Sequence, residues 1–161
     1  MTHATSAARR RGAGRRRAAG TVRPVTLAQL APAIEGVRLS LHVLAATIWV
    51  GGQLTVAGLL PMVRRLGADA PRRLARSFAR LSWPAYAVLL ATGIWNVVAV
   101  AGGQPTTWQV LLGVKIGLVV VAGVAAWLHP RATSPTWLGV WGAVTGLASV
   151  AALVMGVFLA G

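Results

Sequence analysis

The sequence predicts an all-α, polytopic membrane protein: an antiparallel bundle of four transmembrane helices with an Arg-rich tail in front. Of the 161 residues, 56% are hydrophobic and the mean hydropathy is +0.68. Charged residues make up only 11%, whereas soluble proteins carry roughly 25%. Residues 39–60 and 81–114 carry no formal charge, and each run can cross the ~30 Å hydrocarbon core as a helix.

The boundaries of the spans follow from prolines, glycines and charges. Pro61 is expected to close the first span. The run 81–114 is too long for one crossing, and the two glycines and Pro105 of AGGQPTTW predict a turn within it. His129-Pro130-Arg131 ends the third span. The four spans are therefore expected at residues 39–60, 81–101, 108–128 and 137–160.

The segments outside the spans are rich in arginine. Residues 1–24 contain seven arginines, no acids and little apolar surface, so we expect a disordered basic tail in front of a transmembrane domain at 25–161. The loop 64–80 contains a basic amphipathic stretch that we expect to lie on the membrane surface. In an up-down bundle both termini share one side, and the charges closest to the spans favour a cytoplasmic 64–80 loop.

The net charge of +14 points to anionic lipid headgroups as partners, because the arginines flank the spans. No nucleic acid partner is expected, since the basic tail has no interleaved aromatic residues for base stacking. Cysteine is absent and the chain has two carboxylates, neither of them within a span. These facts exclude thiolate ligands and a carboxylate acid–base pair, so any catalysis would belong to a bound cofactor.

The first span carries polar groups that a simple anchor would not need. His42, Trp49 and Gln53 follow each other at spacings of seven and four, which places them on one helical face. A histidine in a span should face protein or a cavity, because lipid offers it no partner. Small residues predict close helix contacts within the bundle or between copies: Gly51, Gly52 and Gly58, and the GxxxG pairs Gly113/Gly117 and Gly142/Gly146.

Counting at 1.5 Å per residue from the span ends places four side chains, one from each helix, in one layer on the tail side: His42, Asn96, Lys115 and Met155. We expect His42, Lys115, Asn96 and Trp49 to bind a cofactor, and His42 with Met155 to hold a metal. The plainer interpretations stay open. Lys115 can extend to the interface, His42 and Asn96 can bond within the bundle, and Met155 can fill space. His129 is expected to be an interfacial residue or part of a second site.

Several short motifs carry a family resemblance. His42 with Trp49-Val50-Gly51-Gly52, the Arg76–Arg80 sequence RSFAR, Thr92-Gly93, and the LLGVK sequence that ends at Lys115 resemble the bacterial copper-resistance CopD family over residues 36–131. The resemblance implies a half-length, four-span relative that handles copper in the bacterial cytoplasmic membrane, alongside a periplasmic copper carrier.

A more distant similarity is to HemJ-type protoporphyrinogen oxidases, which have four spans, an early histidine, and a tryptophan followed by a lysine in the third span. That similarity implies haem b at His42 and Lys115. The sequence therefore leaves three functions open: copper resistance or transport, a haem-binding membrane protein with redox or porphyrin chemistry, and a structural or partner-binding protein without a cofactor. Whether the protein is an enzyme also stays open, as does a homo-oligomeric state.

Overall fold

The computed structural model describes residues 27–160, and the side chains of residues 32–159. The predicted disordered tail, residues 1–24, lies outside the described residues. Within residues 27–160 the fold is all-α, without strands, and four helical segments are long and apolar enough to cross a membrane. These segments cover Pro32–Arg64, Ala70–Val100, Thr106–Arg131 and Pro135–Leu159. The prediction of a four-span membrane bundle is thus confirmed.

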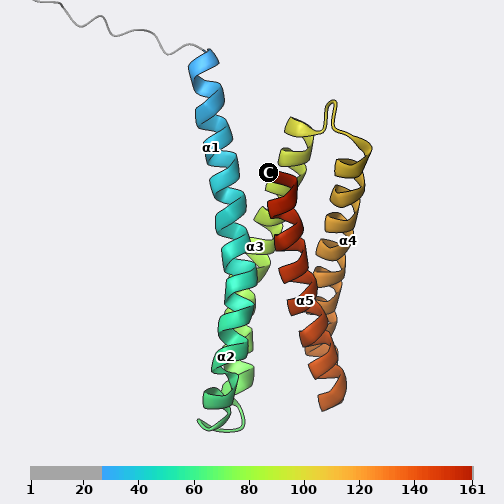
Figure 1. The fold of residues 1–161 in the computed structure, drawn as a ribbon. Helices are drawn as coiled ribbons and strands as arrows, with labels where there is room; N and C mark the ends of the chain where they lie inside the picture. Colours follow the sequence, from blue (N-terminus) through green and yellow to red (C-terminus); the bar gives the residue numbers. More distant parts are fainter. Residues whose placement is uncertain (1–26, 161) are drawn as a thin grey trace, which may run out of the picture.

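The helices run up and down in chain order (Figure 1). The first crossing is one continuous helix in which a π-helical turn, η1, separates α1 from α2. The third crossing ends in a short 3-10 turn, η2. The element bounds are α1 Leu27–Ala46, η1 Thr47–Gly51, α2 Gly52–Arg64, α3 Ala70–Val100, α4 Thr106–Leu128, η2 His129–Arg131 and α5 Pro135–Ala160.

Two boundary predictions are wrong. The first helix does not end at Pro61 but continues to Arg64, because a proline in the last turn removes one backbone hydrogen bond without preventing the few residues after it from staying helical. The basic stretch of the 64–80 loop is not a separate surface segment either. It forms the first turns of α3, which runs without interruption from Ala70 to Val100.

The turns contain the residues that their geometry requires. Between α3 and α4, Gly103 adopts φ 77°, a left-handed conformation that glycine reaches without strain. Pro105 then has an extended backbone directly before α4. At the start of α5, the Ser134 hydroxyl accepts a hydrogen bond from the backbone N–H of Trp137 at 3.3 Å, which satisfies one of the free amides at the helix N-terminus.

The four crossings form two helical hairpins. The first crossing packs along α3, and α4 packs along α5, while contacts between the hairpins concentrate where η1 meets α5 (Figure 1). The buried apolar core consists mostly of alanine: Ala45, Ala85, Ala122, Ala125, Ala148 and Ala152. Small residues let helix backbones approach closely, which is the usual basis of helix association in lipid.

Glycines make close contacts, but not the pairs expected from the GxxxG motifs. A Cβ added at Gly113, Gly117 or Gly146 would meet no neighbouring atom within 4 Å. A Cβ at Gly52 would instead overlap the Phe78 ring, and one at Gly123 would overlap the Tyr86 phenol. Gly52 and Gly123 thus receive an aromatic side chain from α3. Of the four GxxxG glycines, only Gly142 has a close neighbour, the His129 ring at 3.2 Å from an added Cβ.

The absence of native cysteine allows a direct test of the topology. Single cysteines at Leu66 and Thr133, two exposed positions in the connections at one end of the bundle, should react with a membrane-impermeant maleimide from the same side. A cysteine at Gly102, in the α3–α4 turn, should react only from the opposite side. Labelling of intact and opened vesicles measures this, and reaction of all three from one side would contradict the up-down arrangement.

Candidate functional site

The π-helical turn redirects the polar face of the first crossing. His42, before the turn, bonds to Thr92 of α3, whereas Trp49 and Gln53 bond to Ser149 of α5. A π turn is wider than an α turn, so it changes the angular position of the residues that follow. The helical spacing of His42, Trp49 and Gln53 in the sequence therefore does not give the three side chains a common partner. The Gly51-Gly52 pair was the only sign of the π turn in the sequence.

Trp49 lies at the centre of an aromatic cluster. Its side chain is 3% exposed, and its indole N–H donates to the Ser149 hydroxyl at 2.9 Å. Its ring lies 4.4 Å from Tyr86 and 5.9 Å from Trp83, centroid to centroid. The Tyr86 hydroxyl in turn donates to the backbone carbonyl of Val119 at 2.8 Å. The cluster thus connects η1, α3, α4 and α5, and Trp49 packs there rather than beside His42.

His42 bonds to α3 through Nδ1. Nδ1 lies 2.8 Å from the Thr92 hydroxyl oxygen, and that hydroxyl lies 2.7 Å from the backbone carbonyl of Val88. When the single hydroxyl proton goes to this carbonyl, which can only accept, Thr92 accepts the proton on Nδ1. This order leaves the lone pair of Nε2 on neutral His42 free to accept a hydrogen bond or bind a metal.

The neighbours of His42 can be placed by counting from the Trp49–Ser149 hydrogen bond. His42 comes seven residues before Trp49 and Met155 six residues after Ser149, which puts both about 10 Å from that bond, toward the tail side. A Cβ added at Gly93 would lie 3.5 Å from His42 Cε1, so the imidazole packs beside the backbone of α3 at this glycine. Met155 is half-buried on α5 at the same depth.

Lys115 lies in the same layer and does not need to reach the interface. Its ammonium lies against the backbone of Gly156, 3.1 Å from where a Cβ would be. Gly156 is near the C-terminal end of α5, where the helix dipole is negative and favours a cation. The structure therefore brings His42, Lys115 and Met155 to one depth.

A fifth polar residue on the tail side was missed at the sequence level. Arg38 is only 4% exposed. It pairs with the exposed Glu35 at 3.4 Å, and its Nη1 has no partner among the described residues. Asn96 likewise has a buried, unpartnered Oδ1. Since α1 and α3 are antiparallel and His42 meets Thr92, Arg38 and Asn96 each lie one turn closer to the tail side. The sequence did contain a sign of this burial: Arg38 lies four residues before His42, and this spacing puts both on one face of the helix.

His129 lies at the opposite end of the bundle. Its ring packs against Gly142 of α5, and its Nδ1 is buried without a partner among the described residues. It begins η2, next to Pro130 and Arg131. It is thus separated from the tail-side layer by most of the length of α4.

Within residues 27–160, no group of three or more His, Cys, Asp or Glu side chains is close enough to hold a metal ion. A metal bound by His42 would therefore take its other ligands from residues such as Met155 or from a bound molecule. Comparison with known proteins gives no further guide: no family model, curated protein or solved structure matches this chain.

The proton order at His42 can be tested by replacing its acceptor. Thr92→Val keeps the shape of the side chain but leaves Nδ1–H without a partner, which should cost about 1–3 kcal/mol in stability. It should also convert the His42 imidazole from one tautomer to a mixture, as measured by ¹⁵N chemical shifts of the ring. Thr55→Val is the matched control, because the Thr55 hydroxyl bonds only to Gly51 of its own helix. An unchanged His42 spectrum in Thr92→Val would contradict the assignment.

Proposed function

We propose that this protein handles copper within the membrane and that Nε2 of His42 is its principal copper ligand. The observation that carries the proposal is the chain of contacts from His42 Nδ1 to the Thr92 hydroxyl and from that hydroxyl to the Val88 carbonyl, in which Nδ1 can donate and Nε2 stays free. Histidine ligands in metal sites usually donate the other ring N–H to a fixed acceptor in this way, which sets the tautomer and orients the ring. A histidine that served packing alone would not need its second nitrogen free.

A single copper ion suits the space around His42 better than a large ligand does. The imidazole packs between α1 and α3, with Gly93 against Cε1, so an ion can be bound without separating the helices. Copper(I) prefers soft ligands, and the thioether of Met155 lies at the depth of His42. Met62, the other methionine among the described residues, is 62% exposed and lies toward the other end of the bundle. The site proposed here is sparse, which suits an ion that must also leave.

The resemblance of the sequence motifs to CopD proteins points to the same function. On this proposal the protein is a half-length, four-span member of that group in the bacterial cytoplasmic membrane. A periplasmic copper carrier would deliver or receive the ion on the tail side, where His42 is closest to the membrane surface.

Haem b is the second candidate, and the cations of the tail-side layer favour it. Lys115 and the unpartnered Nη1 of Arg38 could each pair with a propionate, and His42 Nε2 could bind the iron. When bound, the porphyrin would supply electron-transfer or oxidative chemistry. The residues fit the polar ends of the group, but the close packing of His42 between α1 and α3 would have to open for the macrocycle.

Metal content and visible spectra of purified variants distinguish these functions. The wild-type protein loaded with copper(I) should retain the ion, and His42→Ala should lose most of it while keeping the helical circular dichroism signal. Lys115→Met should retain copper at least as well as the wild type, because it removes a nearby cation and adds a thioether. His129→Ala is the control at the far end of the bundle and should retain copper fully.

Other results would lead elsewhere. A Soret band that is present in the wild type and disappears in His42→Ala would identify haem, and not copper, as the ligand of His42. Full copper retention in His42→Ala would overturn the proposed ligand, and absence of both copper and haem from the wild type would support a structural role.

A further inference from the structure

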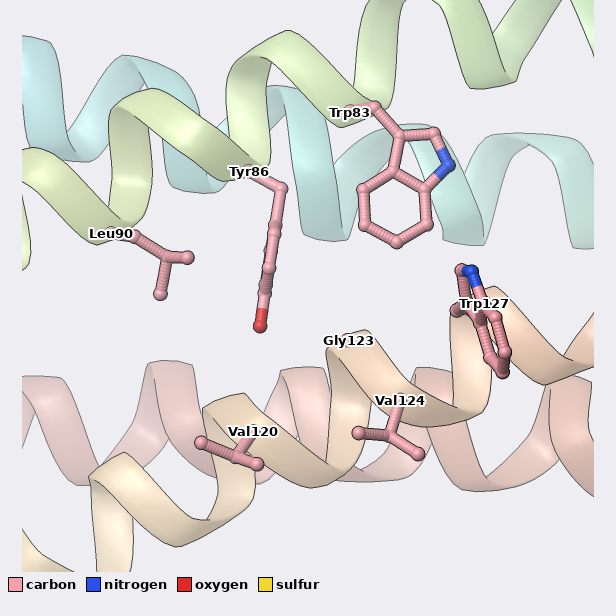
Figure 2. A pocket seen from close by; sticks show the side chains of 7 residues that line it. All are labelled: Trp83, Tyr86, Leu90, Val120, Gly123, Val124 and Trp127. Carbon is pink, nitrogen blue, oxygen red and sulfur yellow. The ribbon is translucent and has the colours of Figure 1, made fainter.

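A second surface feature extends from the middle of the bundle toward the loop side and does not include His42. Between α3 and α4 the two hairpins leave an apolar groove of about 540 Å³. Figure 2 shows its lining: Trp83, Tyr86 and Leu90 on one wall, and Val120, Gly123, Val124 and Trp127 on the other. Tyr86 crosses toward α4, where its hydroxyl reaches the Val119 carbonyl, and so forms the floor.

The loop-side end of this groove is cationic. The Arg131 guanidinium lies 3.7 Å from the centroid of the Trp127 ring, which places a positive charge at the rim formed by α4. Arg80 comes three residues before Trp83 in α3, and this spacing puts it on the same helical face. Within residues 27–160 the single ion pair joins Glu35 to Arg38, so neither rim arginine has a carboxylate partner in the described chain.

Two hydrogen-bond donors lie at the same end. The indole nitrogens of Trp83 and Trp127 are both at the loop-side end of the groove (Figure 2), and neither donates to a described residue. Indole N–H groups at this depth commonly bond to the interfacial parts of lipids. The groove therefore has an apolar length, two N–H donors near its end, and two cations beyond them.

We propose that this groove binds one anionic phospholipid. An acyl chain lies along Leu90, Val120 and Val124, the ester carbonyls accept from the two indole N–H groups, and the phosphate pairs with Arg131 and Arg80. This order of apolar, hydrogen-bonding and cationic groups matches the order of groups along a phospholipid. A second copy of this chain would fit the groove less well. Each copy carries arginines at its loop-side end, so two copies would bring like charges together there.

Native mass spectrometry of the full chain in mild detergent tests the proposal. Phosphatidylglycerol and phosphatidylcholine with identical acyl chains serve as the probes. The wild type should retain one phosphatidylglycerol per chain in clear preference to phosphatidylcholine. Arg131→Gln should lower phosphatidylglycerol retention about fivefold, the typical contribution of one arginine near an anionic headgroup. Arg65→Gln, which removes an exposed arginine at the end of α2, should have little effect.

A second pair of variants tests the groove itself. Val124→Trp fills the groove without removing a charge and should abolish retention of both lipids. Val98→Trp adds the same bulk at a 78% exposed position of α3 outside the groove and should retain lipid normally. Equal retention of the two lipids by the wild type would overturn the anionic preference. Unchanged lipid retention in Val124→Trp would show that the lipid adsorbs to the surface without occupying the groove. A lipid-free dimer of the wild type that Val124→Trp dissociates would identify the occupant as a second copy of the chain.

Discussion

The connection between the two hairpins depends on Trp49. Most of the buried apolar residues of the bundle are alanines, which allow close packing but provide little directional specificity. Trp49 supplies that specificity, since it donates to Ser149 of α5 and packs its ring against Tyr86 and Trp83 of α3. Aromatic pairs contribute about 0.5–1.5 kcal/mol beyond area burial, and an interhelical hydrogen bond in a membrane protein about 0.6 kcal/mol. These contributions are modest, but they fix the relative height of three helices at once.

That register determines which polar residues meet on the tail side. Ser149 is at the height of Trp49, so Met155 reaches the depth of His42, and the packing of α4 on α5 brings Lys115 to Gly156. A slip of one turn between the hairpins would move Met155 and Lys115 by about 5.4 Å relative to His42. The π turn makes this arrangement possible, because it lets the same helix bond to α3 through His42 and to α5 through Trp49.

The sequence was sufficient for the architecture and for the common depth of His42, Lys115 and Met155, because uncharged length and helical rise are set locally. Asn96 lies one turn closer to the tail side than expected. The sequence was insufficient where a neighbouring helix decides the outcome. Pro61 stays helical and the basic stretch before Arg80 joins α3, contrary to the local signals. The buried state of Arg38 and the choice of Gly52 and Gly123 over the GxxxG glycines depend on which side chains α3 presents. No pattern within a single span contains that information.

The copper site and the lipid site proposed here would both depend on the contact between the two hairpins. The copper site lies on the tail side of Trp49, and the lipid site lies beside the aromatic cluster that contains Trp49. His42 belongs to the first hairpin and Met155 to the second, so a copper ion held by both would join the hairpins on the tail side. A lipid in the α3–α4 groove would join them on the loop side. The aromatic cluster, with the Tyr86–Val119 hydrogen bond, lies on the loop side of His42 and contributes Trp83 and Tyr86 to the wall of the groove. A ligand at either site would therefore add to the few contacts that hold the hairpins together, and its binding should stabilise the whole bundle rather than its own surroundings alone.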